Sequence, residues 1–500
     1  MDSDDQVVDD LEAQFNATPP PAPPPPPEVQ DTAKPKRWFE RWLIGPDQPK
    51  AGQTFTRLSR HLSYEVVVTT VTFLMASILL FTSFNGEMRD LYIKARELIG
   101  AYPAVTSDEV VLVTVGTEAL YLWNPEDPAP EVTPRALLGE VVSILDSAGA
   151  NVIVLDFLLH APAPGDERLA QASTAHGAVI AADRFVVTEA AVGAHFAPGP
   201  AASLGEAMAS GFANLGEEAL WTSSDERLVR GTQLVQSVDR ARLSAPWPAS
   251  VGQAQGASQI TPHMALLAAW MHTHPGRAST DTLLARLADG CTPRPLSCKT
   301  SLADLGLPGG PALEGAFPIN FRGPESADGL ATVQAAQLLR LAAEPALYRM
   351  AGVETPAKIP TWLSNEVKGK IVVVGRVDGQ ADDRFATPYG FPLPTRTDMD
   401  GARIQAHAID TLLSGRHVQS APRWTMWTLA GVVLLGLVLT STRLREDLHT
   451  ALALASGLVL VLIGAIIFTL TDGLVLDLSV PLTSLILGIV AIRLRGWAID

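Results

Sequence analysis

The chain has 500 residues, of which 47% are hydrophobic, and its formal net charge at pH 7 is −16. This length allows one large domain with a buried core together with membrane spans. The excess of acidic residues argues against nucleic acid as a partner, because binding of nucleic acid requires clustered basic charge.

The first 62 residues differ in composition from the rest of the chain. An acidic stretch is followed by the tract PPPAPPPPP, which favours an extended polyproline conformation, and then by PKRWFERWLIGP. The mixture of Trp and basic residues in the last stretch is typical of a segment that lies on anionic lipid. The proline tract is either a spacer or a ligand for an aromatic groove of another protein. We expect residues 1–62 to be largely disordered, with membrane lipid as a partner.

Four apolar stretches divide the chain. A helix needs ~20 mostly apolar residues to cross a bilayer, and the stretches that meet or approach this length are 63–84, 422–440, 448–470 and 475–493. They predict four transmembrane α-helices, one before and three after a large loop at 85–421. The first stretch lies too far from the start for a cleaved signal peptide, so we expect it to remain as an anchor.

Basic residues flank these stretches on one side only. Lys34, Arg37 and Arg57 precede the first stretch, Arg443 and Arg445 follow the second, and RLRGWAID follows the last. Because basic residues mark the cytoplasmic flank of a span, both 1–62 and the tail 494–500 are predicted to be cytoplasmic. The loop 85–421 is then predicted to lie outside the cytoplasmic membrane or in the periplasm of a bacterium.

The large loop alternates short apolar runs with helical stretches. Strands are predicted at 109–115, 151–159, 177–182 and 369–377, and helices at 135–149 and 401–415. Strands rich in β-branched residues and separated by helices imply a sheet that is covered on both faces. The predicted fold class is therefore an α/β domain with a mainly parallel sheet. The strand order in the region 190–330 cannot be predicted.

The two cysteines of the chain are Cys291 and Cys298, in CTPRPLSC. If the loop lies outside the cytoplasm, it is in oxidising surroundings, and a disulfide between two close cysteines is expected there. The alternative is a pair of free thiols.

Acidic residues follow two of the predicted strands. Ligands of parallel sheets bind beyond the carboxyl ends of the strands, and the aspartates near those ends are Asp156, Asp166, Asp378, Asp382 and Asp383. These residues predict an acidic pocket for a cation or a basic ligand. The alternative is that Asp156 caps a helix or bonds a loop and that the others are solvated.

Three further polar residues are candidates for ligand binding. Asn320 and Arg322 lie in INFRGP, and His407 lies in the predicted helix 401–415. Each has a structural role as its alternative. The chain contains no Gly-x-Ser-x-Gly elbow, no phosphate loop and no His-Glu-x-x-His pattern. We therefore expect no enzyme activity, no cofactor and no dedicated metal site.

Several segments, taken in order, resemble a known family. They are VVLVTVGTEAL, TPRALLGEVVSIL, GANVIVLDFLLHAPAPGDERLAQA, GFANLG, SSDERLVRG, PINFRGP, GKIVVVGRVDGQADDRFATP and GARIQAHAIDTLLSGR. They are similar to the second type of CHASE domain, the sensory extracellular domain associated with cyclases and histidine kinases, and the resemblance covers roughly Tyr92 to Arg416. The resemblance implies an outward-facing bacterial sensor, usually fused after its last span to a cytoplasmic kinase or cyclase.

The chain departs from the family in two respects. Gly116 stands where members carry an acidic residue, and Ala119 stands where they carry Ser. Only RLRGWAID follows the last apolar stretch, so we expect a separate cytoplasmic effector, such as a kinase or a cyclase. Sensors of this kind are commonly dimers, so a homodimer is one expected state.

Two functions follow from these features. The first is a membrane-anchored sensor that binds an unknown extracytoplasmic ligand and signals to a separate cytoplasmic partner. The second is a membrane scaffold that binds another envelope protein without signalling, and Gly116 favours it somewhat.

Overall fold

The computed structural model describes residues 85–98, 108–127, 130–188, 193–197, 202–205, 207–213, 215–220, 223–239, 258–275, 278–293, 296–324, 328–341, 359–377, 383–390, 399–441, 446–471 and shorter pieces between 473 and 490. The predicted N-terminal segment 1–62, the first predicted span 63–84 and the tail 494–500 lie outside these residues.

A seven-stranded sheet forms the centre of the domain, in the order β13-β1-β14-β2-β3-β4, with β5 also paired to β3. β4 (Gly193–Ala197) is antiparallel to β3, and all other pairs are parallel. The parallel strands are β13 (Ala331–Gln334), β1 (Val110–Val115), β14 (Ile371–Arg376), β2 (Val152–Leu158), β3 (Val179–Thr188) and β5 (Ala209–Phe212). This confirms the predicted α/β domain with a mainly parallel sheet.

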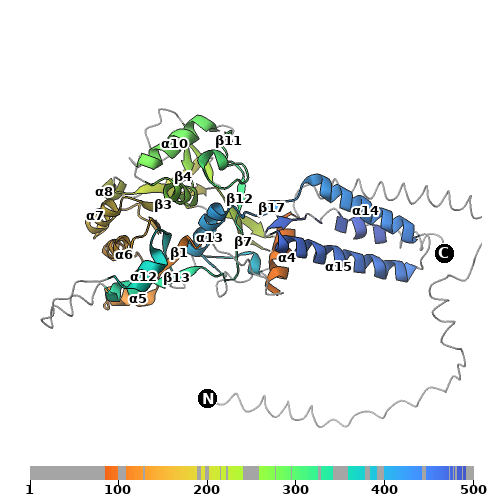
Figure 1. The fold of residues 1–500 in the computed structure, drawn as a ribbon, viewed down its shortest axis with the longest axis horizontal. Coiled ribbons are helices and arrows are strands. Elements are labelled where there is room, and N and C mark those ends of the chain that lie inside the picture. The colour runs from red at the N-terminus through yellow and green to blue at the C-terminus, as the bar shows by residue number, and fades with distance from the viewer. Residues whose placement is uncertain are drawn as a thin grey trace, which may run out of the picture.

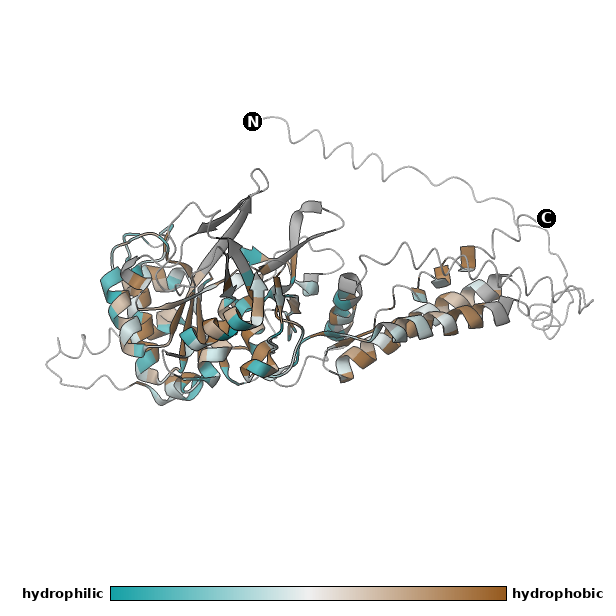
Figure 2. Ribbon diagram, turned by 90° about the horizontal axis from the view of Figure 1, so that it is seen from above, coloured by the Kyte–Doolittle hydropathy of each residue, from teal (hydrophilic) through white to brown (hydrophobic). Residues whose placement is uncertain are grey.

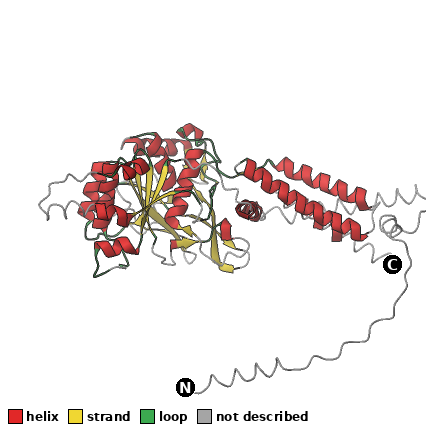
Figure 3. Ribbon diagram, turned by 60° about the horizontal axis from the view of Figure 1, so that its bottom comes forward, coloured by secondary structure: helices red, strands yellow, loops and turns green. Residues whose placement is uncertain are grey.

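Helices cover both faces of this sheet (Figure 3). Successive residues of a strand point to opposite faces, so Val111 and Val113 of β1 join one apolar cluster and Val110 and Leu112 join the other. The first cluster includes helices α5 (Thr117–Trp123), α6 (Arg135–Ala148), α7 (Asp166–His176) and α12 (Thr361–Val367), and the second includes α9 (Met264–Thr273) and α13 (Gly401–Ser414). Burial on both faces explains why these strands have continuously apolar sequences.

The middle of the chain adds smaller elements. A three-stranded antiparallel sheet contains β6 (Leu215–Leu220), β7 (Ser223–Gln233) and β12 (Ala316–Pro318), and β8 (Val235–Asp239) pairs with β9 (Ser258–Pro262). Further elements are α8 (Ala202–Gly205), α10 (Ala278–Gly290), η2 (Ala303–Leu305), β15 (Arg384–Phe385), η4 (Pro388–Gly390) and β16 (Met399–Asp400).

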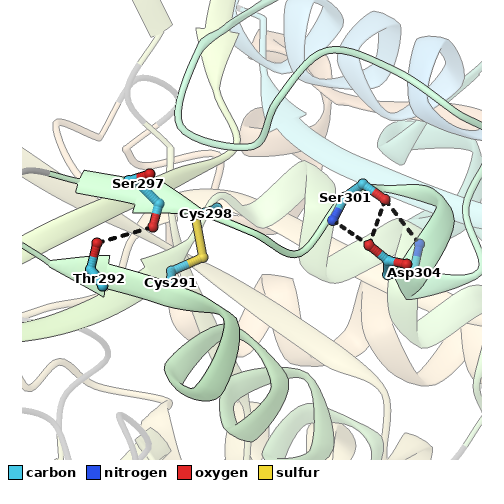
Figure 4. The surroundings of a disulfide bond; sticks show 6 residues. All are labelled: Cys291, Thr292, Ser297, Cys298, Ser301 and Asp304. Atoms are coloured by element: carbon cyan, nitrogen blue, oxygen red, sulfur yellow. Dashed lines mark hydrogen bonds between the residues drawn. A yellow bond between two sulfur atoms is a disulfide. The ribbon is translucent and has the colours of Figure 1, made fainter.

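The two cysteines form a disulfide across a short hairpin (Figure 4). The hairpin consists of β10 (Cys291–Pro293) and β11 (Leu296–Cys298), in which Cys291 lies directly opposite Cys298. The turn that follows is held by Asp304, whose Oδ2 accepts hydrogen bonds from the backbone N and the hydroxyl of Ser301, at 2.8 and 2.7 Å. The disulfide closes the end of the hairpin that directly follows α10 in the chain.

Two long helices extend away from the domain, α14 (Arg423–Ser441) and α15 (Glu446–Leu470) (Figure 1). Among the described residues, one helical stretch is long and apolar enough to cross a membrane, Thr450–Leu470, and Trp424–Leu437 is a shorter apolar helix. Apolar residues run along both helices (Figure 2), and Leu458 and Leu470 are 63% and 80% exposed. The predicted spans at 422–440 and 475–493, and the total of four, stay predictions.

Two elements join the long helices to the domain. β17 (Gln419–Ser420), just before α14, pairs in parallel with β18 (Leu474–Val475), just after α15. Helix α4 (Asn85–Leu98) packs against both α15 and η4. The domain is thus connected to the apolar helices by direct contacts as well as by the chain.

Candidate functional site

An acidic pair lies at the carboxyl ends of β2 and β14. Asp156 of β2 is the register partner of Gly375 of β14. A Cβ atom on Gly375 would collide with Ala402 in the first turn of α13, so the glycine lets this helix start directly on the strand ends. Asp383 also reaches this point, because its Oδ1 lies 2.7 Å from where a Cβ of Gly401 would be. Asp156, Asp383 and the N-terminus of α13 therefore meet.

The surroundings of Asp156 oppose its ionisation. Burial, and then the nearby charge of Asp383, raise the pKa of Asp156 to about 8. Two carboxylates that share a site disfavour each other's charged form, whereas the N-terminus of a helix favours negative charge. A cation, a basic group or a proton that enters this position would relieve the repulsion between the two side chains.

The other predicted aspartates differ in placement. Asp378 and Asp382 lie outside the described residues. Asp166 begins α7 and is buried, and its Oδ1 lies 3.7 Å from Nε of Arg135 on α6. Its Oδ2 accepts a hydrogen bond from the backbone N of Ala163, at 3.1 Å. Asp166 thus joins α7 to α6 and the preceding loop, and a role for it in ligand binding stays a prediction.

The three other candidates, Asn320, Arg322 and His407, lie in a buried polar network on α13. Nε2 of His407 lies 3.2 Å from Oδ2 of Asp328, which also accepts a hydrogen bond of 2.7 Å from Nη1 of Arg403. Arg322 forms an ion pair with Asp410, one helical turn after His407. Arg322 and His407 therefore both belong to ion pairs that involve α13, and both side chains are buried inside the domain.

Asn320 connects this network to the end of α13. Its Nδ2 donates to the carbonyl oxygen of Arg416, at 2.7 Å, and its backbone N donates to Oγ1 of Thr411, at 3.2 Å. Thr411 in turn donates to the carbonyl oxygen of His407, at 2.7 Å. These contacts favour the structural alternative for Asn320, because they hold the segment that follows β12 against the last turn of α13 and the residues after it.

Burial raises the pKa of Asp328, but the hydrogen bonds and charges of His407 and Arg403 act in the opposite direction and leave the pKa below its ordinary value. A network of this kind is costly to break, because a single deletion leaves a charge buried without its partner.

Sequence reasoning missed three members of the network, Asp328, Arg403 and Asp410. A signal for two of them exists in GARIQAHAIDTLL, where Arg403, His407 and Asp410 recur at the spacing of one helical face. Polar residues on a face that is expected to be buried indicate buried partners. No such pattern identifies Asp328, which belongs to a distant segment.

The donor set at the acidic pair fits a hard cation or a basic group in chemical type. Carboxylate oxygens are the ligands that such cations prefer. Within the described ranges, no group of three or more His, Cys, Asp or Glu side chains is placed to hold a metal ion. The pair supplies two carboxylates, and Asp378 and Asp382 belong to the adjoining stretch of chain.

Gly116 lies at the same edge of the sheet. It is the residue between β1 and α5, and its φ and ψ of −99° and 178° are extended. A Cβ atom on it would lie 3.3 Å from the carbonyl oxygen of Val377, at the end of β14. An acidic side chain at this position would therefore add a charge beside the end of β14, the strand that pairs with β2 next to Asp156.

Neither the curated proteins nor the solved structures gave a significant match. The family model of the CHASE2 domain matches residues 66–442, which is most of the chain and includes the sheet, the acidic pair and the network on α13. CHASE2 domains are sensory and typically extracytoplasmic. The chain belongs to the CHASE2 domain family.

Proposed function

We propose that this protein is a membrane-anchored sensor of a cation or of a small basic molecule. Its domain 85–421 lies outside the cytoplasm, the acidic pair of Asp156 and Asp383 binds the ligand, and a separate cytoplasmic effector reads the result. The observation that carries the proposal is the meeting of the two carboxylates at the N-terminus of α13, in a domain of a sensory family. The same pair explains why an uncharged ligand is not expected.

The proposed anchor consists of four spans, with both termini in the cytoplasm. It is supported by the one-sided basic flanks of the apolar stretches and by the apolar helix Thr450–Leu470. The anchor places the protein in the inner membrane of a bacterium, where the domain contacts the periplasm or the medium.

A thermal-shift titration tests the ligand assignment. The full-length protein in lipid nanodiscs is titrated with calcium chloride and, separately, with spermidine, because one is a hard metal ion and the other a polyamine. A ligand that binds only the folded state raises the midpoint of unfolding with concentration. We expect this increase in the wild type and its loss in Asp156→Asn and in Asp383→Asn.

Asp289→Asn is the matched control, because Asp289 is an exposed aspartate on α10 and its removal changes the net charge equally. A rise that persists in both site variants, or a rise that all three variants lose, would contradict the assignment. The cation that raises the unfolding midpoint, calcium or spermidine, shows which class of cation the pair binds.

A second function has an observation of its own. Large apolar side chains are exposed around the carboxyl ends of β1 and β2, namely Tyr121 at 55%, Leu122 at 41%, Val132 at 59% and Leu158 at 39%. Nη2 of Arg135 donates to the carbonyl oxygen of Leu158, at 3.4 Å, which places the start of α6 at the end of β2. Exposed apolar patches are typical of protein interfaces, so this edge suits the scaffold alternative. A stable complex with an envelope protein that is lost in Tyr121→Ser and unaffected by calcium or spermidine would favour it.

A further inference from the structure

Helix α4 presents two different faces to two parts of the molecule. Residues four apart share one face of a helix, whereas residues two apart do not. Asp90 and Lys94 therefore share one face of α4, and Tyr92 and Arg96 share another. Figure 1 shows the helix between the domain and α15.

The first face binds the domain. Asp90 is fully buried, and its Oδ2 accepts hydrogen bonds from Nη2 and Nε of Arg230 on β7, at 2.7 and 3.0 Å. Lys94 donates from Nζ to the carbonyl oxygen of Tyr389 in η4, at 2.9 Å. A buried guanidinium–carboxylate pair with two hydrogen bonds fixes orientation as well as distance. The helix is thus attached to the domain at two points one turn apart.

The second face binds the apolar helix α15 and the segment that follows it. The hydroxyl of Tyr92 donates to the carbonyl oxygen of Leu476, at 2.8 Å, and its ring centroid lies 5.9 Å from that of Phe468. The guanidinium of Arg96 lies 4.4 Å from the centroid of the same Phe468 ring. Gly464 leaves room for Tyr92, because a Cβ atom there would collide with the phenol. Small residues commonly permit such close approach at apolar helices.

One short segment connects the acidic pair to α4. It is 383–390, which begins with Asp383 and ends with η4. Within it, the carbonyl oxygen of Ala386 accepts a hydrogen bond from the backbone N of Val229, at 2.9 Å, and Val229 precedes the Arg230 that holds Asp90. The carbonyl oxygen of Tyr389 accepts the bond from Lys94. A displacement of this segment therefore reaches both attachment points of α4.

We propose that α4 is a coupling helix that transmits displacements of segment 383–390 to α15. The inference rests on the sensor function proposed above and identifies how the acidic pair acts on the anchor. A ligand at the pair changes the position of 383–390, α4 follows through Lys94 and Asp90, and the contacts of Tyr92 and Arg96 pass the change to α15. Such coupling requires that both ends bias one shared element, and α4 is an element that contacts both.

Because coupling is reciprocal, the inference is tested from the α15 side without any ligand. Gly464→Leu places a side chain where Tyr92 packs, whereas Gly431→Leu makes the same change on α14, where no atom lies within 4 Å of the new Cβ. Hydrogen–deuterium exchange is measured on full-length protein in nanodiscs. In Gly464→Leu we expect the amides of 383–390 to exchange about three- to tenfold faster, the range that corresponds to the loss of one ordinary hydrogen bond. In Gly431→Leu we expect no change there.

Tyr92→Phe provides a milder variant if Gly464→Leu does not fold, since it keeps the ring and removes only the hydroxyl that binds Leu476. A gain in exchange at 383–390 in this variant supports the coupling. Unchanged exchange at 383–390 in whichever of Gly464→Leu and Tyr92→Phe folds overturns it.

The thermal-shift titration with calcium or spermidine separates this inference from the proposed ligand. Faster exchange at 383–390 in Gly464→Leu, without any thermal shift by either cation, would support the coupling and contradict the ligand assignment. A thermal shift that depends on Asp383, with unchanged exchange in Gly464→Leu, would support the ligand assignment and overturn the coupling.

Discussion

Asp156 and Gly375 are register partners on adjacent parallel strands, and the absence of a side chain on Gly375 lets Ala402 of α13 pack at this position. The glycine thus sets the distance between the carboxylate of Asp156 and the first turn of the helix. A methyl group at Gly375 would collide with the Cβ atom of Ala402 in α13, which has little freedom to move in a packed core.

Gly375→Ala is therefore expected to destabilise the protein by about 1–3 kcal/mol, the usual cost of overpacking. The control is Gly309→Ala, because a Cβ atom on Gly309 meets no atom within 4 Å. Chemical denaturation of the full-length protein measures both variants. Equal stability of Gly375→Ala and Gly309→Ala would show that α13 does not rest on the strand ends as described.

Asp156 is expected to make stability depend on pH in the opposite sense to an ordinary surface carboxylate. Its pKa is raised from 3.8 to about 8 in the folded state, so between these values the folded protein holds a proton that the unfolded chain releases. Stability then falls as the pH rises through this window. Asp156→Asn should remove this slope and be more stable than the wild type at pH 8, by roughly 1–3 kcal/mol given the partial exposure of the side chain.

The measurement is urea denaturation of the wild type and Asp156→Asn at pH 5 and at pH 8, with Asp289→Asn as the charge-matched control. The difference in unfolding free energy between Asp156→Asn and the wild type should be smaller at pH 5 than at pH 8. A constant difference between the two proteins across this range would mean that Asp156 titrates normally.

The buried network on α13 predicts the opposite pH dependence. The pKa of Asp328 is held below its ordinary value by His407 and Arg403, against the effect of burial. Its stabilising contribution is therefore present above the ordinary pKa, near 4, and is lost as the pH falls through the folded-state pKa. Asp328→Asn should cost about 3 kcal/mol at neutral pH, since it leaves the buried Arg403 without its carboxylate. Denaturation at pH 7 and at pH 3 should show a smaller difference at the lower pH, and a difference that grows on acidification would contradict the network.

Gly116 predicts a gain of function. In Gly116→Asp, an added carboxylate beside the end of β14 should strengthen the binding of a cation at the acidic pair by roughly fivefold, which corresponds to ~1 kcal/mol for one charge at short range in partly solvated surroundings. Gly116→Asn is the control of equal size without the charge. Thermal-shift titrations with calcium chloride compare the two. Identical affinities in Gly116→Asp and Gly116→Asn would place this position away from the bound cation.

The central sheet was predictable because its strands are local and strongly apolar. The runs that became β1, β2 and β14 are buried on both faces, and the helix that became α6 ends where Gly149 takes a left-handed conformation, with φ of 87°. Nothing comparable marks the middle of the chain. The residues of α9 are apolar on all sides because the helix is buried against the sheet and α13, so its sequence lacks the periodicity of a surface helix.

The site was predictable only in part, for a related reason. The positions of Asp156 and Asp383 follow from the general rule for the carboxyl ends of parallel strands. The shared partner of Arg403 and His407 does not follow from any local pattern, because Asp328 is separated from Arg403 by 75 residues and from His407 by 79. Tertiary packing alone brings these charges together.

The central claim is that the domain faces the outside of the cell, and thiol labelling tests it most directly. Glu366→Cys introduces a thiol at an exposed position of α12, while the disulfide of Cys291 and Cys298 leaves the wild type without a free thiol. With a membrane-impermeant maleimide on intact spheroplasts, we expect labelling of Glu366→Cys, no labelling of the wild type, and labelling of Ser3→Cys only after lysis. Labelling of Ser3→Cys in intact spheroplasts, with Glu366→Cys labelled only after lysis, would contradict the claim.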